Sequence, residues 1–214
     1  MVIRRASIVA ALLLTATVFA EDVSYRKEVF HNDRVTAYLL EIPPLQTSSH
    51  RYDKDNVTIF VSGGRAGETQ SRRERFLQNV RNDSTSPLRA IVLEFNDSQG
   101  EAISEMVPVK KQCADGSKTA CVEQKHLFCT AVLCAEDVKI GPHAARSGFA
   151  SDAAQMLVAV SDYALTDALN GTGPATHSRT SGQVEWLPTG AANRWTNTAS
   201  TSARFILIRF SPNP

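Results

Sequence analysis

The chain has 214 residues, of which 43% are hydrophobic and 21% are charged, and its formal net charge is +1 at pH 7. This composition suits one large or two small globular domains and excludes a disordered or collagen-like polymer. Lys and Arg outnumber Asp and Glu by too little to neutralise a phosphate backbone, so the sequence gives no support to a nucleic-acid partner.

The first 20 residues have the pattern of a secretory signal peptide. Arg4 and Arg5 precede an apolar run over residues 8–14, and small residues lead to a cleavage site after Ala20. An uncleaved anchor is the alternative interpretation, but the run is shorter than the ~20 residues that a spanning helix needs. We therefore expect a secreted or periplasmic protein without membrane attachment once residues 1–20 are removed.

Short apolar runs bounded by Gly, Pro, Asn, Asp and Ser clusters follow along the chain. This spacing is typical of an all-β sandwich or barrel. Only residues 72–80 resemble a helix, and their apolar face is narrow. The six predicted strands are Val35–Ile42, Val57–Val61, Leu88–Phe95, Met156–Val160, Val184–Leu187 and Phe205–Phe210.

Four cysteines lie within residues 113–134, and an even number in a secreted chain indicates two disulfides. Zinc sites normally have at least one pair of ligands separated by two to four residues, and only Cys129 and Cys134 come near this spacing, so a zinc site is not favoured. We favour the local pairs because Asp115-Gly116 can form a turn and residues 130–133 a hairpin tip, although three connectivities are open. The local pairs are Cys113 with Cys121 and Cys129 with Cys134.

The chain contains an internal repeat. Residues 82–95 align without a gap on residues 197–210: in both, an Asn opens a polar turn, an Arg follows seven positions later, and a β-run ends in Phe. We interpret the chain as two copies of one β-module. The predicted divisions are a signal peptide (1–20), an N-terminal module (21–96), a cysteine-containing linker (97–135) and a C-terminal module (136–214).

A motif in the second copy carries a family resemblance. Gly182, Pro188, Gly190, Asn193 and Asn197 have the spacing G-x5-P-x-G-x2-N-x3-N. This resembles the second motif of the cupin superfamily, in which a metal-binding His stands at the position of Asn193. The resemblance implies a secreted bacterial two-cupin protein (bicupin), with two jelly-roll-like barrels in tandem joined by a disulfide-bearing linker.

The same resemblance places the ligand positions of both copies. The metals that cupins hold are bound by imidazole and carboxylate groups, whereas these positions offer one imidazole beside phenol, hydroxyl, amide and apolar side chains. We therefore expect neither a metal ion nor another cofactor. The positions are His50, Tyr52, Asn56 and Gln78 in the first copy, and Phe149, Ser151, Gln155 and Asn193 in the second.

Two hypotheses for function follow, since function depends on the site rather than the fold. The first is a non-catalytic small-molecule-binding or structural protein, with a small-molecule ligand in a barrel and a monomeric or weakly dimeric state. The alternative is a cupin-type isomerase, lyase or oxygenase that acts from the N-terminal barrel. His50 and Tyr52 are its candidate catalytic residues, because positions i and i+2 of a strand face the same side. Convergence of these two with Asn56 and Gln78 in one cavity would favour the enzyme.

Overall fold

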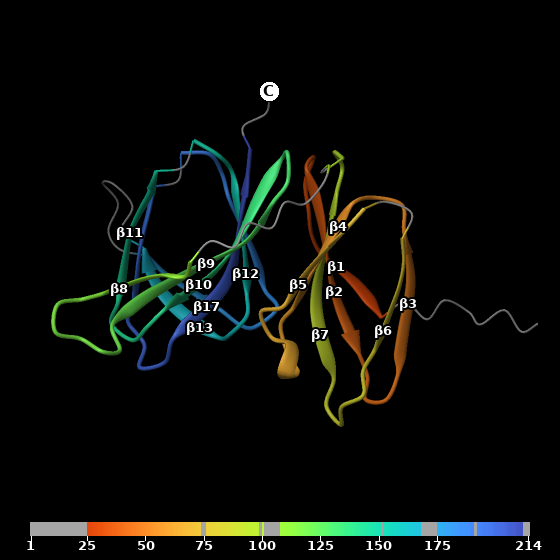
Figure 1. The fold of residues 1–214 in the computed structure, drawn as a ribbon, viewed down its shortest axis with the longest axis horizontal. Coiled ribbons are helices and arrows are strands. Elements are labelled where there is room, and N and C mark those ends of the chain that lie inside the picture. Colours follow the sequence, from red (N-terminus) through yellow and green to blue (C-terminus); the bar gives the residue numbers. More distant parts are fainter. Residues whose placement is uncertain are drawn as a thin grey trace, which may run out of the picture.

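The computed structural model describes residues 25–73, 76–98, 100, 108–150, 152–167, 175–190 and 192–211. The predicted signal peptide (1–20) lies outside these residues. The described chain is all-β apart from one short 3-10 turn, and Figure 1 shows it as two barrels side by side, the first in orange and yellow and the second in green and blue. The all-β fold class is therefore confirmed.

The first barrel contains two sheets. The larger has the strand order β1-β2-β7-β4-β5, and the smaller pairs β3 with β6. The 3-10 turn η1 (Gly63–Arg65) connects β4 to β5. The strands are β1 (Arg26–His31), β2 (Val35–Ile42), β3 (Thr47–Tyr52), β4 (Asn56–Phe60), β5 (Thr69–Arg72), β6 (Phe76–Arg81) and β7 (Leu88–Phe95).

The second barrel repeats this plan with additions. Its sheets have the orders β15-β12-β17-β10-β9-β8 and β11-β16-β13-β14, and the hairpin of β13 and β14 stands where the first barrel has only η1. The strands are β8 (Lys110–Cys113), β9 (Cys121–Cys129), β10 (Leu133–Ile140), β11 (Ala145–Ala150), β12 (Gln155–Ala159), β13 (Tyr163–Asp167), β14 (Ala175–Arg179), β15 (Val184–Leu187), β16 (Ala192–Asn197) and β17 (Ala203–Phe210).

The structure differs from the sequence-based prediction in two segments. Residues 72–80 are not helical where they are described: they end β5 and form most of β6, whose buried side chains at Gln78 and Val80 have the period of two of a strand. Residues 110–135, predicted as part of a linker, form β8, β9 and the start of β10 within the sheet of the second barrel. The side chains of β8 are polar and exposed, and those of β9 are mostly half-buried with a polar run over residues 123–126, so neither strand shows a long apolar run in the sequence.

Equivalent hydrogen bonds support the internal repeat. The side-chain amide of Asn82 donates to three backbone carbonyls, and that of Asn197 donates to the three equivalent carbonyls, at 2.7 to 3.1 Å. Each bond set ties the turn before the last strand of its barrel to the end of β2 or β10. The acceptors are Ile42, Pro43 and Ser86 in the first barrel and Ile140, Gly141 and Thr201 in the second.

An apolar layer joins the barrels, and we call it the inter-barrel core. It combines the outward faces of the two large sheets in one buried cluster. The rings of Phe95 and Phe210 meet across it at 6.2 Å between centroids. Its members are Val35, Ala37, Val57, Ile59, Val61, Ile91, Leu93 and Phe95 from the first barrel, and Phe128, Leu133, Ala135, Met156, Val158, Val160, Ile206, Ile208 and Phe210 from the second.

Both disulfides link neighbouring strands of the second barrel. Cys113 of β8 is bonded to Cys121 of β9, and Cys129 of β9 is bonded to Cys134 of β10. In each case the two cysteines are also direct partners in the strand register. The local pairing favoured from the sequence is therefore confirmed.

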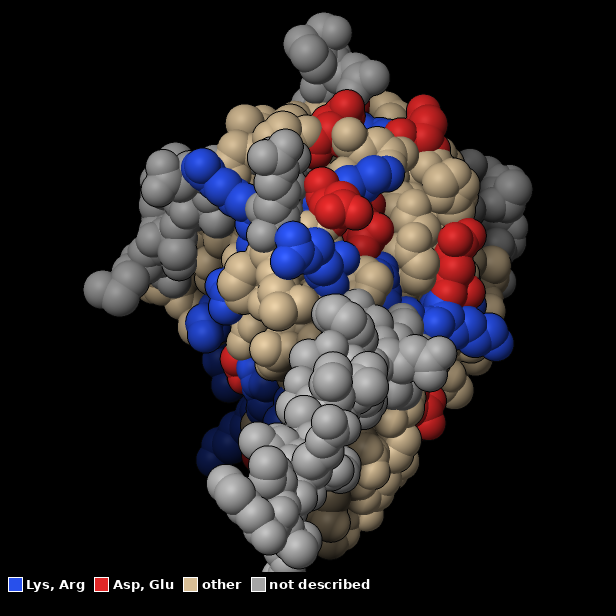
Figure 2. Space-filling view, turned by 90° about the vertical axis from the view of Figure 1, so that its right-hand side faces the viewer, with Lys and Arg blue, Asp and Glu red and all other residues tan. Residues whose placement is uncertain are grey.

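Charge on the surface is mixed, in agreement with the composition. On the face of the first barrel turned to the viewer in Figure 2, Lys and Arg side chains stand beside Asp and Glu side chains over its upper part. Within the described residues, no helix is long and apolar enough to cross a membrane.

The inter-barrel core predicts coupled unfolding of the two barrels. Ile91 is fully buried in the first barrel, and both tryptophans, Trp186 and Trp195, belong to strands of the second. Ile91→Ala should lower the free energy of unfolding by about 2–5 kcal/mol. Because the core is shared, tryptophan fluorescence should report the same shift of the urea midpoint as circular dichroism. An unshifted fluorescence transition in the variant would mean that the barrels unfold independently.

Candidate functional site

The candidate residues of the first copy lie together in the first barrel. His50 and Tyr52 share one face of β3, and their rings meet edge to face at 4.8 Å between centroids. His50 is the direct register partner of Gln78 on β6. Gln78 contacts Thr58 of β4 at 3.4 Å, and Asn56 precedes Thr58 by two residues on that strand. His50, Tyr52 and Gln78 therefore lie side by side, with Asn56 on the neighbouring strand β4, while the roles of these residues stay predictions.

Burial limits what these side chains can do. Tyr52 is 2% exposed, Asn56 1% and Gln78 6%, and the Oδ1 atom of Asn56 has no hydrogen-bond partner among the described residues. Burial is the main cause that raises the pKa of Tyr52 to about 12, and the nearby Arg26 charge opposes this effect. The phenol therefore keeps its proton at neutral pH and is a weaker acid than an ordinary tyrosine.

Arg26 of β1 is the residue that sequence reasoning missed. Its guanidinium donates to Nε2 of His50 and makes an ion pair of 2.6 Å with Oε1 of Glu94 on β7. Its Cζ atom lies 3.9 Å from the ring centroid of Tyr38 and 5.1 Å from that of Tyr52, the geometry of a cation–π contact. The side chain is 8% exposed, so a paired cation fills this part of the barrel.

The residues present do not fit a catalytic first-row metal ion. Such an ion needs several imidazole or carboxylate donors that converge on one point. Here Nε2 of His50 already accepts a bond from Arg26, Glu94 is paired with the same guanidinium, and the other groups are amides and a protonated phenol. Across the described part of the chain, no three His, Cys, Asp or Glu side chains form a group that could hold a metal.

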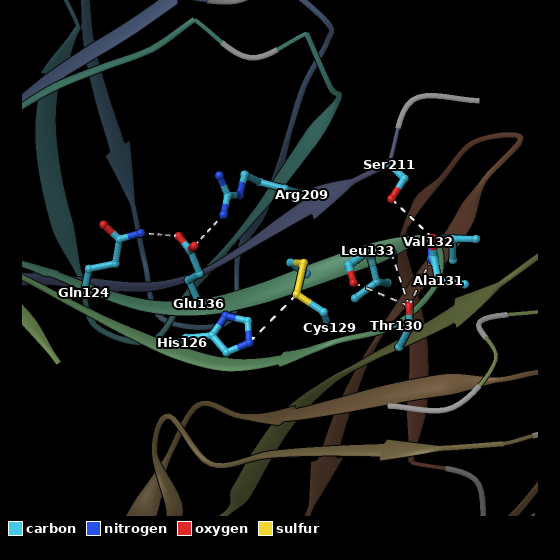
Figure 3. Close-up of a disulfide and its surroundings, with 11 residues drawn as sticks. Gln124, His126, Cys129, Thr130, Ala131, Val132, Leu133, Glu136, Arg209 and Ser211 are labelled. Atoms are coloured by element: carbon cyan, nitrogen blue, oxygen red, sulfur yellow. Dashed lines mark hydrogen bonds and ion pairs between the residues drawn. A yellow bond between two sulfur atoms is a disulfide. The ribbon is translucent and has the colours of Figure 1, made fainter. Parts of the chain in front are cut away.

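The second barrel holds a different ion network at the equivalent strands. Figure 3 shows Glu136 of β10 between Gln124 of β9 and Arg209 of β17, at 2.6 and 2.5 Å. Arg146 of β11 lies 3.8 Å from the same carboxylate and is 6% exposed. Burial lowers the pKa of Arg146 to about 9, although Glu136 opposes the shift. The carboxylate of Glu136 thus makes ion pairs with the guanidinium groups of both Arg146 and Arg209.

The candidate residues of the second copy are only partly described. The backbone of Phe149 pairs with that of Asn193, but Ser151 and the side chains of Phe149 and Asn193 lie outside the described residues. Gln155 is 2% exposed and is the register partner of Arg209, and neither atom of its amide group has a hydrogen-bond partner among the described residues.

Aromatic side chains fill the second barrel beside this network. The rings of Trp195 and Tyr163 both contact Phe205, at 5.5 and 5.8 Å between centroids. The cavity that these rings line with Leu165 has a volume of about 10 Å³. This is about the space that one water molecule needs, so this cavity cannot admit a small-molecule ligand without rearrangement.

Comparisons with known proteins were made at the levels of sequence and structure. No protein-family model matches the chain, and no curated protein matches it. Among solved structures, AerE from Microcystis aeruginosa has a TM-score of 0.61 at 11% identity, over 88% of this chain and 98% of that chain. Salicylate 1,2-dioxygenase from Pseudoaminobacter salicylatoxidans, as a mutant in complex with gentisate, has a TM-score of 0.60 at 10% identity, over 87% and 74%.

Oxalate decarboxylase from Bacillus subtilis is a third structural neighbour. One of its mutants has a TM-score of 0.58 at 10% identity and covers 88% of this chain and 73% of that chain. At these identities the likeness establishes the fold alone. The chain thus has a two-barrel cupin fold, and the fold implied by the resemblance of its second motif is confirmed.

The Arg26 ion pair should contribute measurably to stability. Arg26→Met leaves the carboxylate of Glu94 inside the barrel without its counter-ion, which should cost about 3–5 kcal/mol of unfolding free energy. Lys27→Met, on the exposed side of the same strand, should change stability by less than about 0.5 kcal/mol. Urea unfolding of the two variants and of Arg26→Met/Glu94→Leu checks this. Equal effects of the two single substitutions, or no recovery in the double variant, would contradict it.

The shifted pKa of Tyr52 predicts a loss of stability at alkaline pH. Its pKa in the folded state, about 12, is above the ordinary tyrosine value of 10.0, so between these pH values the folded protein binds more protons than the unfolded chain. The free energy of unfolding should therefore fall as pH rises through this range. Tyr52→Phe should reduce the slope, and Tyr163, whose pKa burial also raises, should keep part of it. An unchanged slope of stability against pH in Tyr52→Phe would refute this assignment.

Proposed function

We propose that this protein is a secreted or periplasmic, non-catalytic member of the two-barrel cupin fold that acts as a small-molecule-binding or structural protein. The observation that carries the proposal is the guanidinium of Arg26, which lies between His50 and Glu94 inside the first barrel. The guanidinium of Arg26 binds the imidazole of His50 and the carboxylate of Glu94, which are the side chains that a metal ion in this barrel would need as ligands.

The chemistry of the retained motif residues supports the same conclusion. A general base must offer a free lone pair to its substrate within hydrogen-bond reach. Nε2 of His50 is engaged by Arg26, and the imidazole ring meets the ring of Tyr52 edge to face. Tyr52 is buried and has a pKa of about 12, so it is a poor proton donor at neutral pH.

Secretion is supported by the disulfides as well as by the leader pattern. Disulfides persist in oxidising compartments such as the periplasm and the extracellular space. All four cysteines of the chain are paired, and no free cysteine remains. The protein is therefore suited to a compartment in which a free thiol would be oxidised.

A cupin-type enzyme that acts through His50 and Tyr52 is the second candidate. The observation in its favour is that His50, Tyr52 and Gln78 lie side by side in the first barrel, and that Gln78 contacts the strand that carries Asn56. Such an enzyme would require the Arg26 side chain to leave His50 when substrate binds. Movement of this kind would break the ion pair with Glu94, which is an energetic cost that substrate binding would have to offset.

Elemental analysis of the purified mature protein tests the non-catalytic proposal against a metal-dependent enzyme. The non-catalytic proposal predicts clearly substoichiometric iron, manganese, nickel, copper and zinc in protein prepared without chelators, in the wild type and in His50→Ala alike. His31→Ala is the matched control, because His31 is exposed and bonded to Thr36 outside the site. Near-stoichiometric metal that is lost in His50→Ala and kept in His31→Ala would overturn the proposal and support the enzyme.

A further inference from the structure

The two barrels contact each other through a pair of equivalent arginines. Arg89 of β7 and Arg204 of β17 lie at matching positions of the repeat, and the backbone N–H of each donates to a serine hydroxyl, Ser62 at 2.7 Å and Ser161 at 3.0 Å. Both side chains are on the outward faces of their sheets, near the first residues of β7 and β17, whereas Phe95 and Phe210 meet at the last residues of these strands. The two arginines can therefore be compared as two versions of one junction.

Each arginine packs against a glycine of the other barrel. Arg89 contacts Gly182, and Arg204 contacts Gly67. Both glycines have a positive φ, 85° and 87°, and any Cβ added there would meet the guanidinium. Because the two junctions have the same arginine–glycine geometry, the acidic partners of the two arginines can be compared directly.

Arg204 is fully paired at its junction. Its Nε and Nη2 atoms donate to the two carboxylate oxygens of Asp137 at 3.1 and 2.6 Å, and its Nη1 donates to the carbonyl of Ala66 in the first barrel at 3.2 Å. Such a bidentate pair is among the stronger polar contacts in proteins. At this junction, each of the three guanidinium nitrogens of Arg204 therefore donates a hydrogen bond.

Arg89 lacks the corresponding carboxylate. Asp137 is the register partner of Ile206, and at the equivalent register with Ile91 the first barrel has Leu39. The nearest acid is Glu41, whose Oε2 lies 3.9 Å from Nε of Arg89, beyond hydrogen-bond range. Nε itself is buried and has no hydrogen-bond partner among the described residues.

A pocket lies beside Arg89 between the barrels. Its volume is about 590 Å³, within the range of small-molecule sites, whereas the pocket beside Arg204 measures about 320 Å³. Val29, Leu39 and Val184 give it an apolar wall, and Arg89 and Arg179 line the rest. Arg179 is already paired with Glu185 at 2.8 Å, so Arg89 is the guanidinium that faces the pocket without a close carboxylate.

We propose that this junction pocket binds a small monocarboxylate with an apolar body. The carboxylate pairs with Arg89 as Asp137 pairs with Arg204, and the apolar part lies against Val29, Leu39 and Val184. The proposal goes beyond the proposed function, because it concerns a site outside both barrels and does not depend on whether His50 or any metal is active.

Binding of 2-naphthoate, followed by ligand-observed NMR titration into the millimolar range, tests the proposal. The wild type should bind 2-naphthoate at least roughly tenfold more tightly than the neutral 2-naphthamide, because a hydrogen bond to a charged group is worth about this factor. Arg89→Gln should weaken 2-naphthoate to the level of the amide. Leu39→Asp should do the same, because it supplies the missing carboxylate within the chain.

Arg204→Gln is the matched control and should leave the affinity for 2-naphthoate within about twofold, since its site is separate. If thermal melting shows that this variant is unfolded, Lys125→Gln, which lines the pocket beside Arg204, replaces it as the control. The proposal is overturned if 2-naphthoate does not bind in this range, if acid and amide bind equally, or if Arg89→Gln and the folded control lose affinity to the same extent.

Discussion

The apolar layer between the barrels is the constraint on which the rest of the molecule depends. β2, β7, β10 and β17 have a barrel interior on one face and the inter-barrel core on the other. Strands that are buried on both faces must be apolar almost throughout, and a polar side chain on them needs a partner. Glu94, Glu136 and Arg209 meet this condition through the networks around Arg26 and Gln124. The ion networks therefore follow from the packing of the barrels and are not additions to their surface.

The same constraint explains which elements could be predicted from the sequence. Val35–Ile42, Leu88–Phe95 and Val184–Leu187 were predicted with the bounds that the structure has, because their apolar runs stand out between turn residues. The outer strands β3 and β6 were missed, because one of their faces meets solvent and residues such as Thr47, Arg51 and Asn79 interrupt the run. The fold class, the internal repeat and the disulfide pairing could be predicted from the sequence, since each depends on a local pattern.

Only part of the candidate site could be predicted from the sequence. The resemblance to the cupin motifs placed His50, Tyr52, Asn56 and Gln78, and the structure brings them into one barrel. Arg26 carries the main electrostatic feature of that barrel, yet it lies in a polar segment 24 residues before His50 and 68 before Glu94. The pairing of β1 with β2 and the closure of the barrel bring Arg26 to His50 and Glu94. Neither of these long-range contacts produces a local sequence pattern.

Fusion of the two modules in one chain has an evolutionary consequence at the Arg89 and Arg204 junctions. In a dimer of identical single barrels, every substitution appears twice, so both junctions would change together. A tandem chain removes this restriction, because Leu39 and Asp137 are encoded separately. One junction can keep a bidentate ion pair that orients Arg204 toward the carbonyl of Ala66 in the other barrel, while the other junction is free to diverge. Duplication within a chain thus allows one copy of a contact to preserve the architecture and the other to acquire a new use.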